Sequence, residues 1–342
     1  MKKHISFPSI EQFRNICSYI NKNYAFIGIQ NGEPVYDVTL LKPTIKFRGT
    51  VKLHGTNASV CYNATDGYWV QSRENIITPE KDNAGFAFFA ESNKVEFLVL
   101  INKVLQDNSL KSTDCTVSIY GEWVGKGVQK SVGVSNLDKS FFIIGVKISP
   151  NNEEPAYWVE SNCLSCFEKR IYNINDYETY SLDVDFIRPD VAQNKLIEYT
   201  IEVEKECPIA KAFGFEGIGE GIVWVGEYKG QLLRFKVKGE LHSKSKVKTL
   251  NTVDSEKVDQ ILFLAKQVTP EWRLQQMLEQ SCDLLNGGQL DRSKLGDYIR
   301  LVINDVVKEE LDVIAETGLE LKDINKPISD IARKYFFEQE KV

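Results

Sequence analysis

The chain has 342 residues, of which 42% are hydrophobic and 26% charged, an ordinary composition for a globular protein, and this length predicts two domains. No apolar run approaches the roughly 20 residues of a membrane-spanning helix, and the first residues lack the apolar core of a signal peptide, so we expect a cytoplasmic protein with no membrane partner. The net charge of −6 lies in residues 251–342, with 12 Lys and Arg against 18 Asp and Glu, while the remainder is neutral and can bind phosphates through clustered basic groups.

The seven cysteines are scattered along the chain, a pattern that favours reduced thiols over a disulfide framework. Cys163 and Cys166 form a close pair, but a zinc site needs two more ligands, and no second pair or neighbouring histidine offers them. We therefore expect structural thiols here.

In chain order, the first element is an amphipathic helix from Ser9 to Asn21, which Ser9 caps. From about residue 44 to residue 238 the sequence predicts short strands that are rich in β-branched and aromatic residues and bounded by Gly, Asn or Asp. The expected strands are Val51–Tyr62, Tyr68–Ser72, Cys115–Val124, Ser140–Ile148, Gly221–Val225 and Leu232–Lys238. Helices near Lys94–Leu105 and Gln193–Lys205 interrupt them.

The pattern becomes helical after about residue 250. The expected helices are Ser255–Val268, Trp272–Leu285, Asp291–Ile314 and Pro327–Phe337, with a break at Gly287–Gly288. The run Lys244–Lys248 is either a solvated linker or a contact to a nucleic-acid backbone. The expected fold class is therefore α+β, with a mainly antiparallel-sheet domain over residues 1–248 and a small all-α domain over residues 249–342.

A candidate nucleophile, Lys52, stands at the opening of a predicted strand, with Gly55 three residues further on. A lysine amine is a poor nucleophile near neutral pH because its pKa is about 10.4, and burial or nearby cations favour the reactive neutral form. Its attack on the α-phosphate of ATP would give a lysyl phosphoramidate and release pyrophosphate. Taken alone, Lys-x-x-Gly is a weak signal, because a surface lysine before a turn glycine has the same pattern.

Three further charged residues lie beside predicted strands. Arg73 follows a strand and has the donor geometry for a phosphate or a ribose edge. Glu122 lies between a strand and a glycine-rich turn, and Glu220 directly precedes an apolar strand.

The strand Leu233–Lys238 alternates, so Arg234, Lys236 and Lys238 share one face. Three cations on one face repel each other unless they are solvated or hold anions, and a triphosphate is a natural anion for such a face.

In this order the segments resemble the motifs of the covalent nucleotidyltransferase superfamily of ligases and capping enzymes, and are most similar to ATP-dependent RNA ligases of the bacteriophage RNA ligase 2 type. The most specific motif is Lys52-x-His54-Gly55-Thr56-Asn57. The later motifs, in family order, are Ser72-Arg73, Gly121-Glu122, Phe141-Phe142 with the following strand, Glu220–Val223 and Lys236–Lys238. The helical tail also resembles this branch, whereas DNA ligases and capping enzymes carry a β-barrel domain after the catalytic domain.

The resemblance implies an antiparallel-sheet adenylylation domain, ATP as the AMP donor, Mg²⁺ or Mn²⁺ as the metal, and RNA ends, in nicked duplexes or single strands, as the partner. Nothing in the sequence demands more than a monomer. The implied nucleotide-binding residues are Lys52, Leu53, His54, Gly55, Asn57, Arg73, Glu122, Glu220, Lys236 and Lys238.

By the same resemblance, Lys52 is the catalytic AMP acceptor and Glu122 holds the ribose. Glu220 helps to place the metal, and Lys236 with Lys238 grips the phosphates. His54 and Asn57 lie near the ribose and phosphates, and Arg73 contacts the nucleotide or the RNA terminus. Transfer of a phosphoryl group asks chiefly for positioning and charge stabilisation, which lysines and Mg²⁺ supply.

Two features depart from the family pattern. Ile144 and Gly145 stand where the family has an aromatic residue that stacks on adenine, followed by an acid. An aliphatic face is therefore expected to hold the adenine. Glu216 precedes a glycine, as Glu220 does, but only Glu220 leads into an apolar strand, and we assign the motif to Glu220.

Two alternatives remain open at this point. One is another enzyme of the superfamily, a DNA ligase or an RNA-capping guanylyltransferase. The other is a non-catalytic nucleic-acid-binding relative, against which the intact set of Lys52, Glu122, Glu220, Lys236 and Lys238 argues.

Overall fold

The computed structural model describes residues 2–339 except 31, 38, 83, 153, 243–253, 280–284 and 287–288. It divides into two compact units. The first comprises Met1–Ile16, Ile45–Asp183 and Lys195–Leu250, and the second comprises Cys17–Thr44, Val184–Asn194 and Asn251–Val342. The second unit thus contains two segments from before residue 248, Cys17–Thr44 and Val184–Asn194. The boundary between a catalytic domain and a helical domain at residue 248 stays a prediction.

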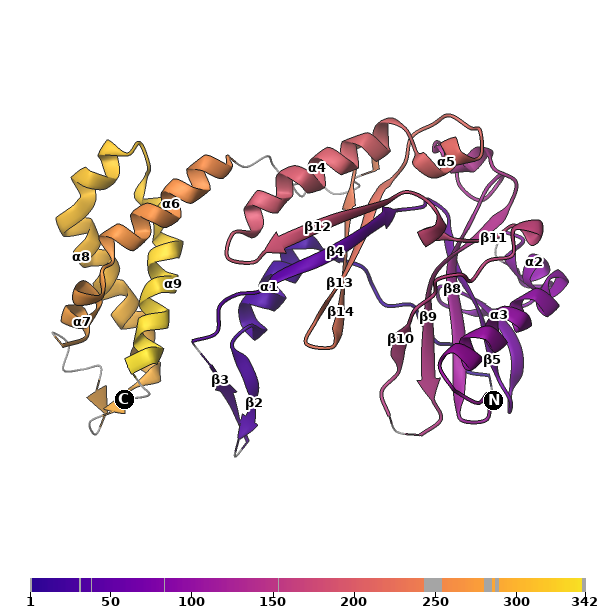
Figure 1. Cartoon of the computed structure of the whole chain (residues 1–342), viewed down its shortest axis with the longest axis horizontal. Coiled ribbons are helices and arrows are strands. Elements are labelled where there is room, and N and C mark those ends of the chain that lie inside the picture. The colour runs from indigo at the N-terminus through magenta and orange to yellow at the C-terminus, as the bar shows by residue number, and fades with distance from the viewer. Residues whose placement is uncertain are drawn as a thin grey trace. The chain divides into compact units, whose positions relative to one another are not determined.

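The first unit contains a five-stranded sheet (Figure 1). Its strands, in spatial order, are β1 (Glu11–Gln12), β14 (Gln231–Lys238), β13 (Gly221–Tyr228), β4 (Thr44–Val51) and β12 (Thr179–Asp185). Strand β13 runs antiparallel to both β14 and β4, and β1 pairs in parallel with β14. Phe235, on the buried face, contacts Phe47 at 5.1 Å and stacks with Trp224 at 6.3 Å between ring centroids. This packing fixes the ends of β4, β13 and β14 relative to one another.

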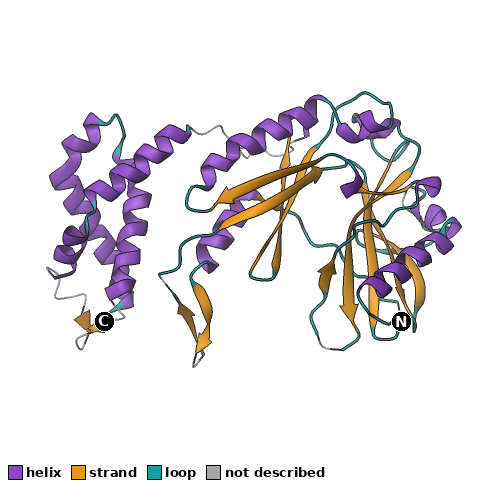
Figure 2. Ribbon diagram, viewed as in Figure 1, coloured by secondary structure: helices purple, strands orange, loops and turns teal. Residues whose placement is uncertain are grey.

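A seven-stranded sheet forms the other half of the unit. Its strands are β5 (Thr56–Asn63), β6 (Gly67–Ser72), β7 (Ile76–Ile77), β8 (Cys115–Val124), β9 (Ser140–Pro150), β10 (Tyr157–Val159) and β11 (Ile171–Asn173). The order is β10-β9-β8-β5-β6-β7, with β11 paired to β9. Helices α2 (Phe86–Ser92) and α3 (Lys94–Asp107) cover it through a core that includes Phe86, Trp123 and Phe141 (Figure 2).

Helices α4 (Pro189–Lys205) and α5 (Pro208–Ala212) precede β13. In the second unit, α1 (Phe13–Asn23) leads into a hairpin of β2 (Phe26–Gln30) and β3 (Glu33–Tyr36). The C-terminal helices are α6 (Ser255–Val268), α7 (Glu271–Glu279), α8 (Leu295–Glu316) and α9 (Leu321–Gln339), with a short hairpin of β15 (Leu285–Asn286) and β16 (Gln289–Leu290). Their shared apolar core includes Tyr298, Val306, Ile328 and Phe336.

The expected α+β class, with antiparallel sheets and a helical C-terminal region, is confirmed. The single predicted strand Val51–Tyr62 is wrong, because β4 ends at Val51 and β5, which lies in the other sheet, begins at Thr56. The predicted helix start at Ser9 is also wrong, because Glu11 and Gln12 pair with β14 before the helix begins at Phe13.

The C-terminal helices are confirmed with shifted ends. Of the helix predicted over Trp272–Leu285, the structure describes Glu271–Glu279 as helical and places Leu285 in β15, while residues 280–284 lie outside the described residues. Helix α9 begins at Leu321, so that Pro327 lies inside it. The run Lys244–Lys248 and the break at Gly287–Gly288 lie outside the described residues.

Candidate active site

Lys52 lies on the connection between the two sheets, directly after β4. Its backbone N–H donates to the carbonyl oxygen of Gly221 at 2.7 Å, which ties the residue to the start of β13. The side chain is 20% exposed. The amine is therefore held at a fixed point between the sheets and remains accessible.

Glu220 is the acid on which this site converges, and only 3% of its side chain is exposed. One carboxylate oxygen, Oε2, lies 2.6 Å from Lys52 Nζ and 3.2 Å from His54 Nδ1. The other, Oε1, lies 2.6 Å from Lys238 Nζ. The antiparallel pairing of Gly221 with Lys238 brings the acid and this lysine together. A buried carboxylate is costly unless it is paired, and these contacts provide the pairing.

The charges around Glu220 decide its ionisation. Burial by itself raises the pKa of this carboxyl, but the charge of Lys52 and the hydrogen bonds from Lys238 and Lys52 outweigh it and lower the pKa to about 2. Glu220 is therefore ionised at neutral pH and is a very weak base.

Glu122 approaches Lys52 from the seven-stranded sheet, where it pairs with Asn57 across β5 and β8. Its Oε1 accepts a hydrogen bond from the backbone N–H of Gly55 at 3.1 Å. Desolvation, with a smaller contribution from Glu220, raises its pKa to about 7 against the opposing charge of Lys52. The two acids thus differ widely in pKa, because the contacts with Lys52 and Lys238 outweigh burial at Glu220, whereas burial outweighs the charge of Lys52 at Glu122.

Gly55 is required by the close approach of β8. A Cβ at this position would collide with the carbonyl oxygen of Trp123. The glycine of the Lys52 motif thus brings the connection against β8, where its N–H reaches Glu122.

The predicted cationic face of β14 is present, with Arg234, Lys236 and Lys238 partly buried and alternating with buried apolar residues. Burial, and then the charges of Lys238 and Lys52, lower the pKa of Lys236. Its Nζ donates to the carbonyl oxygen of Ile10 at 2.9 Å. Arg234 lies over the Trp158 ring, 3.9 Å from its centroid, and burial lowers the pKa of its guanidinium to about 10.

A small cavity of about 90 Å³, called the Lys52 cavity below, opens beside these charges. Its charged lining residues are Lys52, Glu122 and Arg234. Thr50 also lines it, and the apolar lining residues are Phe7, Ile10, Val51, Leu53, Ile144, Ile174, Val223 and Val225. Charged and apolar lining residues in one cavity suit a ligand that combines phosphates with an apolar ring.

Phe7 and Ile10 were missed by the sequence reasoning. The N-terminal segment reaches the cavity because the backbone of Ile5 bonds with the side chains of Gln71 and Tyr120. The Phe7 ring packs against Tyr120, with centroids 5.2 Å apart. No local pattern marks this segment, because its partners lie in distant strands.

Most of these site residues lie in a part of the sequence that matches a known protein family. The model of the RNA ligase family matches residues 45–238, more than half of the sequence. The chain belongs to the RNA ligase family. Lys52, Glu122, Glu220 and Lys238 all lie inside the match, whereas the N-terminal part of the Lys52 cavity lies outside it.

Solved structures of Naegleria gruberi RNA ligase are similar to the chain. A mutant with AMP and Mn is 16% identical, with a TM-score of 0.39, and a mutant with ATP and Mn is 15% identical, also at 0.39; each match covers 71% of this chain and 58% of that one. A further mutant, solved apo, is 17% identical with a TM-score of 0.41. The chain thus spans 58% of the length of these ligases. No curated protein matches it.

The remaining residues predicted from the RNA ligase resemblance lie as follows. Asn57 Nδ2 donates to the carbonyl oxygen of Gly121 at 3.4 Å. Arg73 is exposed, and its charge acts on the pKa values of Glu122 and Lys236. Glu216 is exposed and lies outside the cluster formed around Glu220.

The described residues contain no group of three or more His, Cys, Asp or Glu side chains that could hold a metal ion. None of the helices described is long and apolar enough to cross a membrane.

Proposed function

We propose that this chain is an ATP-dependent RNA ligase of the bacteriophage RNA ligase 2 type, which joins 3′-hydroxyl and 5′-phosphate ends through AMP carried on Lys52. The observation that carries the proposal is the buried Glu220 carboxylate that holds Lys52 and Lys238 at 2.6 Å each, beside the Lys52 cavity. Membership of the RNA ligase family supports this reaction class.

In the first step the Lys52 amine attacks the α-phosphorus of ATP. The N–P bond forms, the bond to the β-phosphate oxygen breaks, and pyrophosphate leaves. An ammonium has no free electron pair, so Lys52 must lose a proton and separate from Glu220 before it attacks. The proton passes to water or to the leaving pyrophosphate.

The next two steps use the bound AMP. An RNA 5′-phosphate oxygen attacks the AMP phosphorus, so the N–P bond breaks and a pyrophosphate linkage caps the strand. The 3′-hydroxyl then attacks the 5′-phosphate, the phosphodiester forms, AMP leaves and a proton is released. Holding both ends turns this last step into an effectively intramolecular reaction.

The cationic residues are proposed to act on the phosphates. Lys236 and Lys238 stabilise charge on the leaving pyrophosphate. His54, on the same connection as Lys52, and Asn57, near the start of β5, are assigned to the ribose and phosphates. Arg73, exposed after β6, is assigned to the nucleotide or the RNA terminus.

The nucleoside is proposed to enter the Lys52 cavity. Glu122 accepts hydrogen bonds from the ribose hydroxyls, and Ile144 and Val223 offer an aliphatic face to the adenine. Phe7 adds an aromatic ring to the same lining.

The proposed reaction also uses Mg²⁺ or Mn²⁺. The residues fit such an ion, because Mg²⁺ takes one or two carboxylates together with phosphate oxygens and water, and Glu220 and Glu122 are the acids present. A bound ion would neutralise charge on the triphosphate. Both oxygens of Glu220 contact cations, so direct ligation by Glu220 requires a lysine to shift to the phosphates.

Labelling the protein with AMP tests this function. The purified chain, first treated with pyrophosphate to remove bound AMP, is incubated with a divalent metal and ATP or GTP labelled at the α-phosphate, and the denatured chain is examined for label. We expect label from ATP only, none in Lys52→Ala, and normal label in Lys46→Ala, which removes an exposed lysine from the same strand. Label in Lys52→Ala would remove Lys52 from its role, and no label in the unaltered chain would favour a binding protein.

A further inference from the structure

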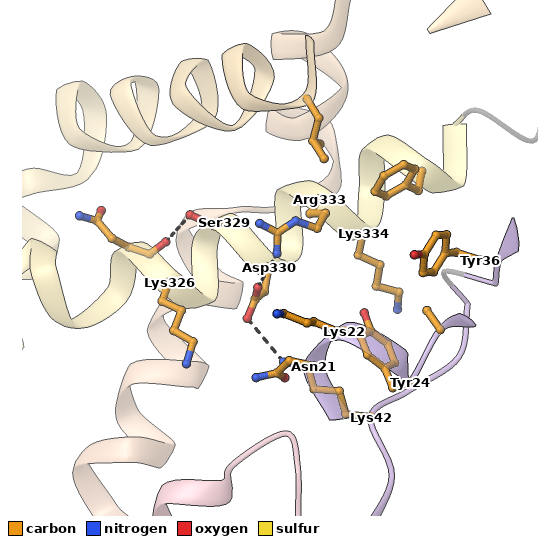
Figure 3. Close-up of a pocket in the computed structure, with 14 residues that line it drawn as sticks. Asn21, Lys22, Tyr24, Tyr36, Lys42, Lys326, Ser329, Asp330, Arg333 and Lys334 are labelled. Atoms are coloured by element: carbon orange, nitrogen blue, oxygen red, sulfur yellow. Dashed lines mark hydrogen bonds and ion pairs between the residues drawn. The ribbon is translucent and has the colours of Figure 1, made fainter. Parts of the chain in front are cut away.

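A second and larger cavity, of about 790 Å³, lies within the second unit. One wall is formed by the end of α1 and the β2–β3 hairpin with the segment after it, and the other by α9 (Figure 3). It is called the basic cavity below. Every residue that lines it belongs to the second unit, so it is distinct from the Lys52 cavity.

Five of its lining residues are cations, namely Lys22, Lys42, Lys326, Arg333 and Lys334, against one acid, Asp330. Asp330 lies 3.1 Å from Arg333 and 3.7 Å from Lys42, so its charge is already shared. Among the described residues, no carboxylate forms an ion pair with Lys22 or Lys326. Lys334 lies 3.7 Å from Glu338, so the five cations have two acids near them and the cavity still carries excess positive charge.

This excess is local. Residues 251–342 hold 12 Lys and Arg against 18 Asp and Glu, so the C-terminal part as a whole repels a polyanion. Helix α9 turns Ile324, Ile328 and Phe336 into the apolar core. The opposite side of the helix carries the cations toward the cavity (Figure 3). The basic residues thus gather where the helix is not needed for packing.

Aromatic rings stand among the cations. Tyr24, Tyr36 and Phe337 line the same cavity, and 45% of the surface of Tyr36 is exposed. Cations in a groove with accessible rings are the combination that binds single-stranded nucleic acid, because cations hold the backbone and rings stack on bases. A small anion would need no rings, and a duplex would not present its bases to them.

We propose that the basic cavity binds a single strand of the RNA substrate, with its phosphates on Lys326, Arg333 and Lys334 and a base on Tyr36. The inference rests on the proposed function for the identity of the strand, but it adds a binding site that is separate from the nucleotide site. None of the residues that line the basic cavity lines the Lys52 cavity, so the basic cavity contributes to affinity and takes no part in AMP transfer.

The test measures binding of a fluorescent, 5′-phosphorylated single-stranded RNA to the full chain, without ATP, over a range of KCl concentrations. The test variant combines Lys326→Gln, Arg333→Gln and Lys334→Gln. The matched control combines Lys266→Gln, Lys308→Gln and Lys322→Gln, which removes the same charge from exposed positions of α6, α8 and α9 outside the cavity. Since each single-strand phosphate contact contributes about 0.7 to the salt slope, the test variant should lose about 2 from the slope and bind at least about tenfold more weakly. The control should retain the original slope.

Equal slopes and affinities in the two triple variants would overturn the proposal. Tyr36→Leu tests the base contact, with an expected loss of about tenfold in affinity at an unchanged salt slope. Unchanged affinity in Tyr36→Leu would overturn that contact.

All of these variants should still take label from ATP, because none of the substituted residues lies at the Lys52 cavity. A chain that binds RNA through the basic cavity but takes no label would contradict the ligase proposal alone. A chain that takes label but binds RNA independently of the cavity would contradict this inference alone.

Discussion

Glu220 holds its two lysines through different oxygens, so the residues around it act as a set. Lys52 must leave the carboxylate to become a nucleophile, and Lys238 keeps the remaining negative charge paired when it does. Without Lys238, the buried carboxylate would attract Lys52 more strongly, since an unpaired charge of this kind is costly. Lys238 is therefore expected to pair with Glu220 before ATP binds and to stabilise the phosphates of ATP afterwards.

Replacing Lys238 with alanine should lower the rate of self-adenylylation by about 100-fold, the usual effect of removing one charge-stabilising group. The chain should stay folded, because 31% of this side chain is exposed. The measurement is the initial rate of label transfer from ATP, with circular dichroism as the folding check. Lys238→Met, which keeps the apolar stem, should show the same loss, and a normal rate in both variants would contradict the role.

Glu122 gives the folded chain a specific dependence on pH. Its folded pKa of about 7 lies above the ordinary 4.5, so between these values the folded chain keeps a proton that the unfolded chain releases. The contribution of Glu122 to the free energy of unfolding is therefore greatest below about pH 4.5. It declines by on the order of 1–3 kcal/mol as the pH rises to about 7.

The prediction is that Glu122→Gln removes this decline. Urea unfolding at pH values from about 4.5 to 7.5, without nucleotide or metal, gives the difference in stability between the two proteins. That difference should grow in favour of the variant as pH rises. Glu227→Gln, at an exposed position of β13, is the control and should follow the unaltered chain. A constant difference for Glu122→Gln would show that this carboxyl titrates at its ordinary pKa.

Not all of these residue contacts were accessible to sequence reasoning. Glu220 was chosen over Glu216 because an apolar strand follows it, and the structure places Glu220 and not Glu216 at Lys52. That Glu220 joins Lys52 to Lys238 was beyond prediction, because it depends on the register of β13 against β14. Motifs give the residue types, whereas strand register decides which of them meet.

At the scale of elements, the N-terminal segment acts as part of the Lys52 cavity although it lies outside the family match. Phe7 lines the cavity and packs against Tyr120 and Trp158. It lines the same cavity as Ile144, which stands where the family pattern has an aromatic residue and where the sequence led us to expect an aliphatic face for the adenine.

We expect Phe7→Leu to raise the KM for ATP in self-adenylylation between about twofold and tenfold, because an aromatic pair contributes about 0.5–1.5 kcal/mol beyond its buried area. The maximal rate should change little, since Lys52 and Glu220 are untouched. Phe88→Leu, at an exposed position of α2, serves as the control. An unchanged KM in Phe7→Leu would leave the adenine to the aliphatic lining alone.

The elements differ in how well the sequence predicted them. Strand β8 was predicted with its bounds, Cys115–Val124, because it is a long β-branched and aromatic run between polar residues. The short strands β10, β11 and β12 and the β2–β3 hairpin carry no such pattern and were not predicted. The N-terminal segment was missed for a related reason, since its hydrogen bonds reach Gln71 and Tyr120 and leave no local periodicity.

At the scale of the whole molecule, the C-terminal helices have an apolar core of their own, built from residues between Leu264 and Phe336. Every residue that lines the Lys52 cavity belongs to the other unit. The core of the C-terminal helices therefore shares no residue with the Lys52 cavity.

Deletion of residues 249–342 should therefore leave self-adenylylation within about twofold of the full chain while it lowers the joining of RNA ends by about 100-fold or more, because end joining depends on holding both strands. Label from ATP and joining of a nicked duplex and of single strands are measured on the same preparations. The triple variant Lys326→Gln, Arg333→Gln and Lys334→Gln in the full chain separates loss of the basic cavity from loss of the whole helical region. If the helices act through the basic cavity, the triple variant should join RNA ends nearly as slowly as the truncated chain does. A normal joining rate in the truncated chain would show that the helical region is dispensable.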